Sequence, residues 1–116
     1  MLRTVPELLA EVRADLRLLD ARAAMLEAAT NNGTVIDVRE PEEVQAKPAS
    51  ASINIPRGVL EMLVTEKIRD ADHPIYIHCA SGARALLAAE QLERIGYKSV
   101  SVISCPIDSV CEVQQS

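Results

Sequence analysis

The residues best suited to chemistry lie in one short segment, residues 75–84, with the sequence Ile-Tyr-Ile-His-Cys-Ala-Ser-Gly-Ala-Arg. The apolar run before Cys79 predicts a buried strand, and the apolar periodicity after Gly82 predicts a helix. A tight loop at a helix N-terminus points several backbone N–H groups inward and can hold an anion. Gly82 permits backbone angles that a side chain would forbid, and Arg84 adds a full positive charge. The pattern therefore favours a thiolate at Cys79, and the same loop would hold a terminal persulfide anion, Cys79–S–S⁻.

A cysteine at a strand end can also be a small buried apolar residue, and this is the default for the other two cysteines. Cys105 and Cys111 lack a comparable loop, although they could form a resolving thiol pair. An odd number of cysteines argues against a disulfide framework. No cysteine pair has C-x-x-C spacing, and neither His73 nor His78 is placed with the cysteines as a zinc site requires. We therefore expect no metal, and at least one free thiol.

Two charged residues close the predicted strand 34–38, at the sheet edge where the cysteine loop would also lie. Asp37 and Arg39 could line the site beside that loop. Alternatively, an ion pair or turn bond could hold Arg39 to Glu42 or Glu43. We favour a structural role for Arg39 and leave both roles open for Asp37.

Each of three other side chains could have one of two roles. Arg57 follows a proline near a strand end and could bind an anionic donor or be a solvated loop charge. His78 should point to the face of the sheet opposite its neighbours, which favours a satisfied core histidine over a general base. Ser81 could donate to sulfur or cap the helix that follows.

The order of elements predicts an α/β fold with a short central parallel sheet flanked by helices, because strands alternate with helices along the chain. The first 30 residues are predicted to be helical, with a break near residues 17–20. Asp20 could cap the second helix, and Gly33 suits its end. In such sheets, sites form at the carboxyl ends of the strands. The predicted strands are 34–38, 53–55, 75–78 and 100–103, and the later helices are 41–45, 59–69, 83–95 and 107–113.

Composition limits the class of protein. The 116 residues are 48% hydrophobic but only 2% aromatic, which predicts one domain with an aliphatic core. A net charge of −5 disfavours nucleic acid or an anionic membrane as a partner. No segment approaches the ~20 apolar residues of a membrane helix, and residues 1–13 do not resemble a signal peptide. We therefore expect a cytoplasmic location.

Four motifs of this sequence resemble motifs of the rhodanese family and occur in the same order. The active-site pattern Cys-x-x-Gly-x-Arg corresponds to Cys79-Ala-Ser-Gly-Ala-Arg84. The others resemble the family's Asp-Val-Arg-x-x-x-Glu, Asn-Ile-Pro and Leu-x-x-x-Gly-aromatic-x-x-Val segments. They lie at residues 37–43, 54–56 and 92–100.

The resemblance implies a three-layer rhodanese fold formed by one domain, residues 1–116, with the helical segment 1–30 packed on it. It also implies transfer of sulfane sulfur from a donor such as thiosulfate to a thiol or cyanide acceptor. No metal or organic cofactor is implied, and a sulfur-relay protein could be a partner. The resemblance implies that Cys79 is the nucleophile and persulfide carrier, and that Arg84 closes the loop. The backbone groups that line the sulfur pocket belong to Ala80, Ser81, Gly82 and Ala83.

The match departs from the family in two places, residues 47–51 and 104–110, which concern the pocket rim and the C-terminal packing. Two rival functions remain. A cysteine phosphatase or arsenate reductase has a similar loop with one more residue, whereas four residues separate Cys79 from Arg84 here. A non-catalytic rhodanese-like module that binds a partner or senses redox state is the other alternative.

Overall fold

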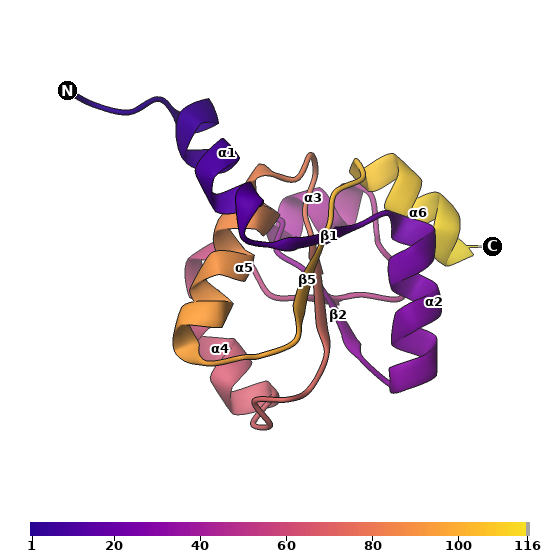
Figure 1. Cartoon of the computed structure of the whole chain (residues 1–116). Helices are drawn as coiled ribbons and strands as arrows, with labels where there is room; N and C mark the ends of the chain where they lie inside the picture. The colour runs from indigo at the N-terminus through magenta and orange to yellow at the C-terminus, as the bar shows by residue number, and fades with distance from the viewer. Residues whose placement is uncertain (116) are drawn as a thin grey trace.

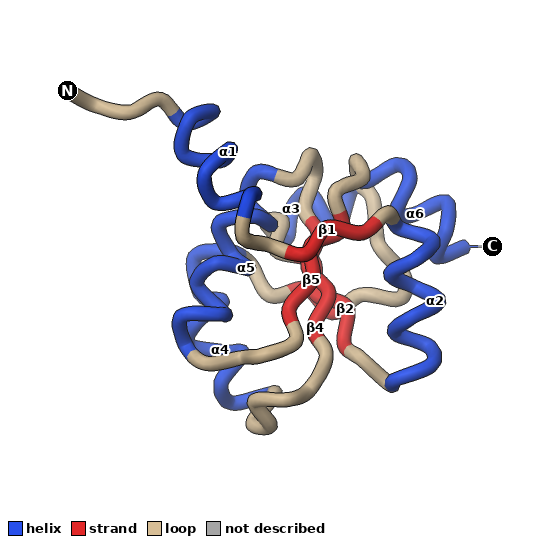
Figure 2. The backbone as a smooth tube through the Cα atoms, viewed as in Figure 1, coloured by secondary structure: helices blue, strands red, loops and turns tan. Residues whose placement is uncertain are grey.

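Five short parallel strands form the centre of the fold, in the order β1-β5-β4-β2-β3. They are seen in a computed structural model that describes residues 1–115 (Figures 1 and 2). All five strands point the same way, so their carboxyl ends meet at one edge of the sheet. The strands are β1 (Arg17–Leu19), β2 (Thr34–Asp37), β3 (Ile53–Asn54), β4 (Ile75–His78) and β5 (Val100–Ile103).

Helices cover both faces of this sheet. Figure 1 shows α4 and α5 on one side of the strands and α2 and α6 on the other, with α1 packed beside α5. The predicted α/β fold with a parallel sheet between helical layers is therefore confirmed. The helices are α1 (Val5–Ala14), α2 (Ala21–Asn31), α3 (Pro41–Ala46), the 3₁₀ turn η1 (Arg57–Val59), α4 (Leu60–Lys67), α5 (Ala83–Ile95) and α6 (Ile107–Gln115).

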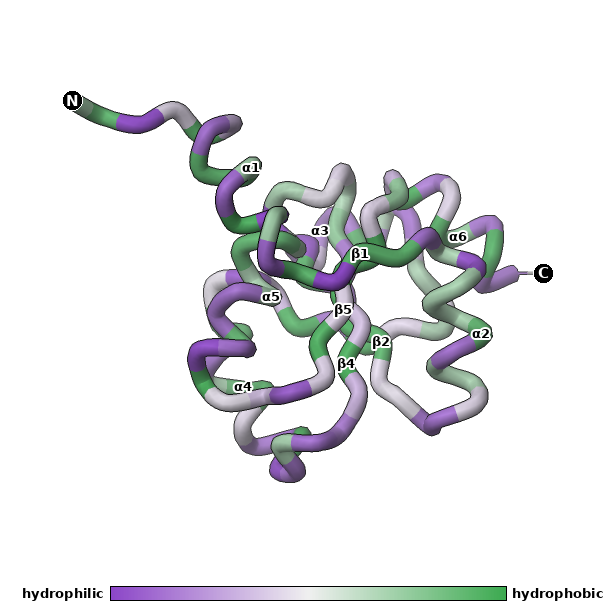
Figure 3. Tube along the Cα trace, in the orientation of Figure 1, coloured by the Kyte–Doolittle hydropathy of each residue, from purple (hydrophilic) through white to green (hydrophobic). Residues whose placement is uncertain are grey.

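Alternation along β4 divides the buried side chains between two clusters. Ile75 and Ile77 belong to the cluster under α4 and α5, whereas Tyr76 belongs to the cluster under α2 and α6. Figure 3 shows hydrophobic colour along the central strands and alternating colour along the helices. Because successive side chains of a strand point to opposite faces, His78 and Cys79 also diverge. Cys79 lies in the α4–α5 cluster.

The first 30 residues contain a strand that the helical prediction missed. Residues 17–19 form β1, which pairs with β5 through Arg17 opposite Ser101. The two helices were predicted, and the break near residues 17–20 is this strand. A three-residue edge strand is too short to show alternation, and Leu16 and Leu19 continue the helical spacing of the preceding leucines.

The end of α2 also differs from its prediction. Asp20 caps the helix as expected, because its Oδ1 accepts from Ala23 N–H at 2.8 Å. The left-handed residue that ends the helix is Asn32, at φ 59°, rather than Gly33. Gly33 is required for another reason: a Cβ there would lie 2.7 Å from Tyr76 Cε2.

The elements around the cysteine loop match their predicted ranges. Strands 75–78 and 100–103 and helix 83–95 are observed as predicted, and the helix stops at Gly96 with φ 128°. The predicted helix 59–69 is instead a 3₁₀ turn followed by α4, which ends at Lys67. Throughout residues 1–115, no helix combines the length and apolarity needed to cross a membrane.

Candidate active site

Cys79 lies directly after β4, and its sulfur accepts two backbone hydrogen bonds. The Gly82 N–H donates to Cys79 Sγ at 3.0 Å, and the Ala85 N–H donates at 3.4 Å. The cysteine is buried, with 1% of its surface exposed. Gly82 has φ +107°, a left-handed conformation that turns the chain tightly enough to bring these amides onto the sulfur. Amide donors of this kind stabilise negative charge on the atom that accepts from them.

The loop residues contribute unequally. Of the four that the family resemblance places around the sulfur, only Gly82 donates to it among the residues described. The second donor, Ala85, lies one residue beyond Arg84 and was missed. The Ala80 carbonyl accepts from Ile107 N–H at 2.9 Å, which fixes the loop to the start of α6. Ser81 is exposed and does not cap α5, whose N-cap Gly82 has no side-chain partner, so the capping interpretation is wrong.

Arg84 closes the loop through an ion pair with α3. Its two terminal nitrogens bind the two carboxylate oxygens of Glu43 at 2.6 and 2.9 Å. This contact, together with the Glu40 N–H, lowers the pKa of Glu43 to about 2. Glu43 in turn raises the pKa of Arg84, and Cys79 does so to a smaller extent. The guanidinium therefore fixes the start of α5 and places its charge near the sulfur without a direct hydrogen bond to it.

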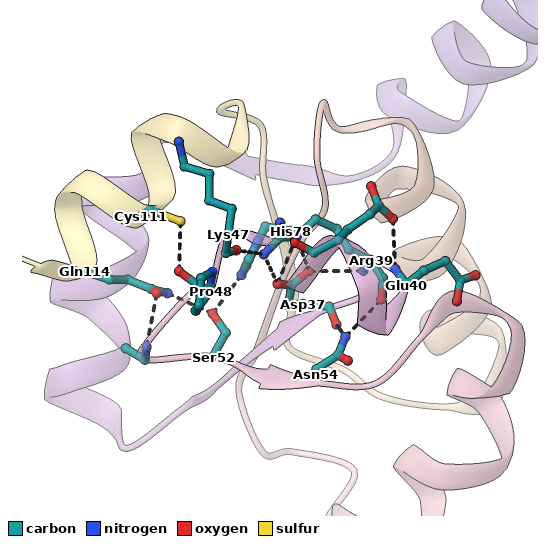
Figure 4. Close-up of polar contacts among 12 residues, drawn as sticks. Asp37, Arg39, Glu40, Lys47, Pro48, Ser52, Asn54, His78, Cys111 and Gln114 are labelled. Carbon is teal, nitrogen blue, oxygen red and sulfur yellow. Dashed lines mark hydrogen bonds and ion pairs between the residues drawn. The ribbon is translucent and has the colours of Figure 1, made fainter. Parts of the chain in front are cut away.

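Asp37 and Arg39 form a buried ion pair at the end of β2 (Figure 4). Arg39 is 2% exposed and binds both carboxylate oxygens of Asp37, with the shortest contact at 2.8 Å. Its other bonds go to the carbonyls of Glu43, at 3.2 Å, and Lys47, at 2.8 Å. The predicted bond to Glu43 thus exists through the carbonyl, but the carboxylate partner is Asp37. Asn54 Nδ2 binds the carbonyls of both paired residues, and this completes a structural anchor.

This anchor reaches the cysteine loop through α3. Arg39 holds two carbonyls at the carboxyl end of α3, and the side chain of Glu43 leaves the same helix towards Arg84. The Asp-Val-Arg-x-x-x-Glu pattern therefore has a physical meaning here. Its Asp and Arg fix α3 to the sheet, and its Glu fixes the loop to α3.

Arg57 pairs with a neighbour on its own segment of the chain. Its guanidinium binds Glu61 at 2.9 Å, one turn along the chain, and its side chain is 28% exposed. Its backbone N–H donates to the Val38 carbonyl at 3.1 Å. The structure links Asp37, Arg39 and Arg84 through α3 but leaves Arg57 outside this network.

His78 is fully buried on the opposite face of the sheet from Cys79. Its Nε2 lies 2.7 Å from Ser52 Oγ, which also accepts from Gln114 Nε2 at 2.8 Å (Figure 4). Its Nδ1 has no hydrogen-bond partner within the described part of the chain. Burial lowers the pKa of His78, which favours a neutral ring. The predicted core histidine is confirmed, although only one of its nitrogens is satisfied.

The other two cysteines pack separately. Cys111 is buried and its thiol donates to the Pro48 carbonyl at 3.3 Å, whereas Cys105 Sγ accepts from Ala21 N–H at 3.3 Å. All three cysteines are free thiols. Because Cys105 and Cys111 have different partners, they do not form a disulfide in this structure. Among residues 1–115, no group of three or more His, Cys, Asp or Glu side chains could hold a metal ion.

The rhodanese-like domain family matches residues 20–111. The chain belongs to this family. A Schizosaccharomyces pombe protein, named as a candidate mitochondrial thiosulfate sulfurtransferase, is 30% identical over 57% of this chain and 54% of its own length. The Bacillus subtilis protein YrkF, named as a candidate sulfur carrier, is 36% identical over 57% of this chain and 35% of its own length. The rhodanese-like chain thus spans about half or less of these relatives.

Solved structures show the same fold. The polysulfide-sulfur transferase homodimer of Wolinella succinogenes has a TM-score of 0.73 and 28% identity, covering 91% of this chain and 80% of that one. An E. coli rhodanese with anions has a TM-score of 0.61 and 28% identity, covering 66% and 89%. RPA3614 of Rhodopseudomonas palustris, described as a possible tyrosine phosphatase of unknown function, has a TM-score of 0.83. At 21% identity, over 97% of this chain and 92% of that one, it shows the fold alone.

Proposed function

We propose that this rhodanese-like domain is a sulfurtransferase that carries sulfane sulfur as a persulfide on Cys79. The observation that carries the proposal is the pair of amide hydrogen bonds from Gly82 and Ala85 to the sulfur. An uncharged thiol needs no such donors, but a thiolate and a terminal persulfide both gain from them. Family membership and the names of the relatives support the same chemistry.

In the first half-reaction, the Cys79 thiolate attacks the outer sulfur of thiosulfate. A sulfur–sulfur bond to Cys79 forms, and the bond between the outer sulfur and the sulfonate group breaks. Sulfite leaves with the electron pair of that bond. The charge that accumulates on the transferred sulfur is stabilised by the loop amides and by the nearby Arg84.

In the second half-reaction, cyanide or a thiolate attacks the outer sulfur of the persulfide. The bond to Cys79 breaks, its electron pair returns to Cys79 as a thiolate, and thiocyanate or a new persulfide leaves. The cycle balances without an external oxidant or reductant. A sulfur-relay protein could supply or accept the sulfur in the same manner, in the cytoplasm that the sequence predicts.

Loop size argues for sulfur over phosphate. Four residues lie between Cys79 and Arg84, one fewer than in the phosphatase loop. The smaller ring suits a single added sulfur atom better than a tetrahedral oxyanion. The guanidinium is also occupied by both oxygens of Glu43, so it is not free to bind a phosphate ester.

One observation favours a non-catalytic module as the second candidate. Cys79 is only 1% exposed, so part of the loop must move before a donor or acceptor can reach the sulfur. A module that shields this sulfur would bind a partner or sense redox state without catalytic turnover.

A paired assay tests the proposal. Purified protein is given thiosulfate with cyanide in one reaction and a phosphate monoester in the other. We expect thiocyanate from the wild type, none from Cys79→Ser, and no phosphate release from either. Phosphate release that depends on Cys79 would favour a phosphatase, and the absence of both products would favour the non-catalytic module.

A further inference from the structure

The start of α6 is bonded to the residue that follows Cys79. The Ile107 N–H donates to the carbonyl of Ala80 at 2.9 Å, from the first turn of the helix, where backbone N–H groups have no partner within the helix. Ala80 belongs to the loop whose Gly82 N–H donates to Cys79 Sγ. A movement of Ala80 that opens this loop would therefore break its bond to α6.

The other end of α6 is connected to the residue that precedes Cys79. Gln114 Nε2 donates to Ser52 Oγ at 2.8 Å, and this hydroxyl lies 2.7 Å from Nε2 of His78 (Figure 4). The Nδ1 atom of His78 has no hydrogen-bond partner within residues 1–115, so the buried ring is held through Nε2. Both neighbours of Cys79 in the chain are thus connected to one helix.

Segment 47–52 runs along α6 and fixes the helix in this position. Three positions of the segment bond to three positions of the helix, in the same order along both. The pairs are Lys47 with Asp108, the Pro48 carbonyl with the Cys111 thiol at 3.3 Å, and the Ala51 N–H with Gln114 Oε1 at 3.1 Å. Because the helix positions are three apart, they lie along one face of α6.

This contact joins the two places where the sequence departs from the rhodanese pattern, residues 47–51 and 104–110. It lies behind the cysteine, because α6 covers the face of the sheet opposite α4 and α5, whereas Cys79 belongs to the cluster under those two helices (Figure 1). Helix α6 therefore acts on the position of the loop without occupying the place of a sulfur donor or acceptor.

We propose that α6 controls access to Cys79: the loop opens when α6 separates from segment 47–52 and closes when the helix returns. The inference rests on the proposed function, since a thiol that is 1% exposed must become accessible before it can exchange sulfur with another molecule. The ion pair of Arg84 with Glu43 keeps the start of α5 in place, so the movement is confined to residues 79–83. Gln114 is a positioning residue, which acts on the sulfur through the loop.

Alkylation of Cys79 by N-ethylmaleimide measures the open population, when opening and closing are fast relative to the reaction. The initial rate is read from the mass gain of tryptic peptide 70–84, which contains no other cysteine. Gln114→Ala removes both bonds to segment 47–52 and should raise the rate at least about fivefold, because each hydrogen bond contributes a factor of about two to ten. Gln115→Ala, at the exposed neighbouring glutamine, is the matched control and should stay within about twofold of the wild type.

A second pair of variants tests the same contact at Cys111. Cys111→Ser keeps a donor for the Pro48 carbonyl, whereas Cys111→Ala removes it. Because a thiol is a weak donor, Cys79 should be alkylated about twofold to threefold faster in Cys111→Ala than in Cys111→Ser. Equal rates in this pair, together with equal rates in the glutamine pair, would overturn the inference.

Tyr76→Phe is the control for a general loss of stability. It removes a hydroxyl that bonds Glu27 and Asn31 on α2, and it leaves the contact of α6 with segment 47–52 in place. It should lower the free energy of unfolding in urea but leave the alkylation rate of Cys79 unchanged, because a local opening keeps the bonds to α2. An equal rise in Tyr76→Phe and Gln114→Ala would show that Cys79 is reached by global unfolding, which contradicts the inference.

Amide hydrogen exchange tests whether the loop and α6 move together. The Ile107 N–H is held by the Ala80 carbonyl, and the Gly82 N–H is held by Cys79 Sγ. Gln114→Ala should speed exchange at both amides by the same factor as alkylation. Faster exchange at Ile107 alone would show that the helix moves without the loop, and the inference would fail.

The outcomes keep the two proposals apart, because alkylation requires no sulfur transfer. If thiosulfate never loads sulfur onto Cys79, the proposed function fails, whatever the alkylation rates are. If the wild type loads sulfur but Gln114→Ala and Gln115→Ala are alkylated and loaded at equal rates, only the inference about α6 is overturned. If both proposals hold, thiosulfate loads Gln114→Ala faster than Gln115→Ala.

Discussion

Cys79 and Cys111 are both buried thiols, at 1% and 4% exposure, but their hydrogen bonds have opposite polarity. Cys79 Sγ accepts from two backbone N–H groups, whereas the Cys111 thiol donates to a backbone carbonyl. The first arrangement stabilises a negative sulfur, and the second requires the proton to stay on. Burial alone therefore does not separate these two sulfurs, but the direction of their hydrogen bonds does.

The difference arises from the position of each cysteine in the secondary structure. Cys79 stands where a strand passes into a helix, so it meets the N–H groups at the start of α5 that have no partner within the helix. Cys111 lies inside α6, where the backbone amides are used by the helix, and its side chain meets the carbonyl of a loop. The predictions below test this contrast and the anchors that maintain it.

The largest effect is expected from the cysteines themselves. Cys79→Ser should reduce sulfur transfer from thiosulfate to cyanide to the background rate, because serine cannot form the persulfide. Cys111→Ser should keep most of the activity, since a hydroxyl can donate to the same Pro48 carbonyl. Thiocyanate formation measures both. Equal losses in the two variants would remove the distinction between the two sulfurs.

Among the side-chain contacts around the site, the buried Asp37–Arg39 ion pair should contribute most to the stability of the fold. Asp37→Asn leaves Arg39 charged and buried without a counter-ion, which should cost about 3–5 kcal/mol of unfolding free energy. Urea denaturation measures it. Asp72→Asn breaks an exposed pair with Lys98 and is the control, with an expected change of about 0–1 kcal/mol. A small loss for Asp37→Asn would show that the anchor is dispensable.

At Gly82, the backbone conformation should limit substitution more than the room for a side chain does. Gly82 has φ +107° and Gly58 does not have a positive φ, yet an added Cβ meets nothing within 4 Å at either position. Gly82→Ala should therefore cost about 1–2 kcal/mol and slow persulfide formation, because the strained loop turns its amide away from the sulfur. Gly58→Ala should change neither quantity by a comparable amount. Thermal unfolding and thiosulfate loading rates give both readouts, and identical behaviour of the two variants would contradict the role of the loop.

The smallest effect is expected from the Glu43–Arg84 pair. The folded-state pKa of Glu43 is about 2, below its ordinary value of 4.5, so the pair stabilises the fold above pH 4.5 and loses this contribution as pH falls towards 2. The Glu43 side chain is 37% exposed, so solvent screening limits the contribution to about 1 kcal/mol or less. Glu43→Gln should therefore be less stable than the wild type near neutral pH, and the difference should vanish in acid. Glu42→Gln, at the exposed neighbouring position, should show no such pH dependence.

The sequence predicted the parts of this site that local pattern controls. The apolar run before Cys79, the glycine and the helical periodicity after it determine strand, turn and helix within one short segment, so this part was correct. The order of strands and helices likewise predicted the parallel sheet. The edge strand β1 was missed because three residues beside a leucine-rich helix carry no separate signal.

The missed features depend on which side chains meet. Asp37 and Arg39 are two residues apart at a strand end, which places their side chains on the same face, and this spacing could have revealed the pair. Glu43 was considered only for Arg39, since nothing local shows that Arg84 lies within reach of α3. Ala85 was missed because its contribution is a backbone N–H, which residue type does not reveal.

The most direct test maps the transferred sulfur. The protein is incubated with thiosulfate, quenched without reductant and digested with trypsin, which separates the peptide 70–84 with Cys79 from the peptide 99–116 with the other two cysteines. The account predicts a gain of one sulfur atom on peptide 70–84 and none on peptide 99–116. Sulfur on peptide 99–116 alone, or on neither peptide, would contradict it.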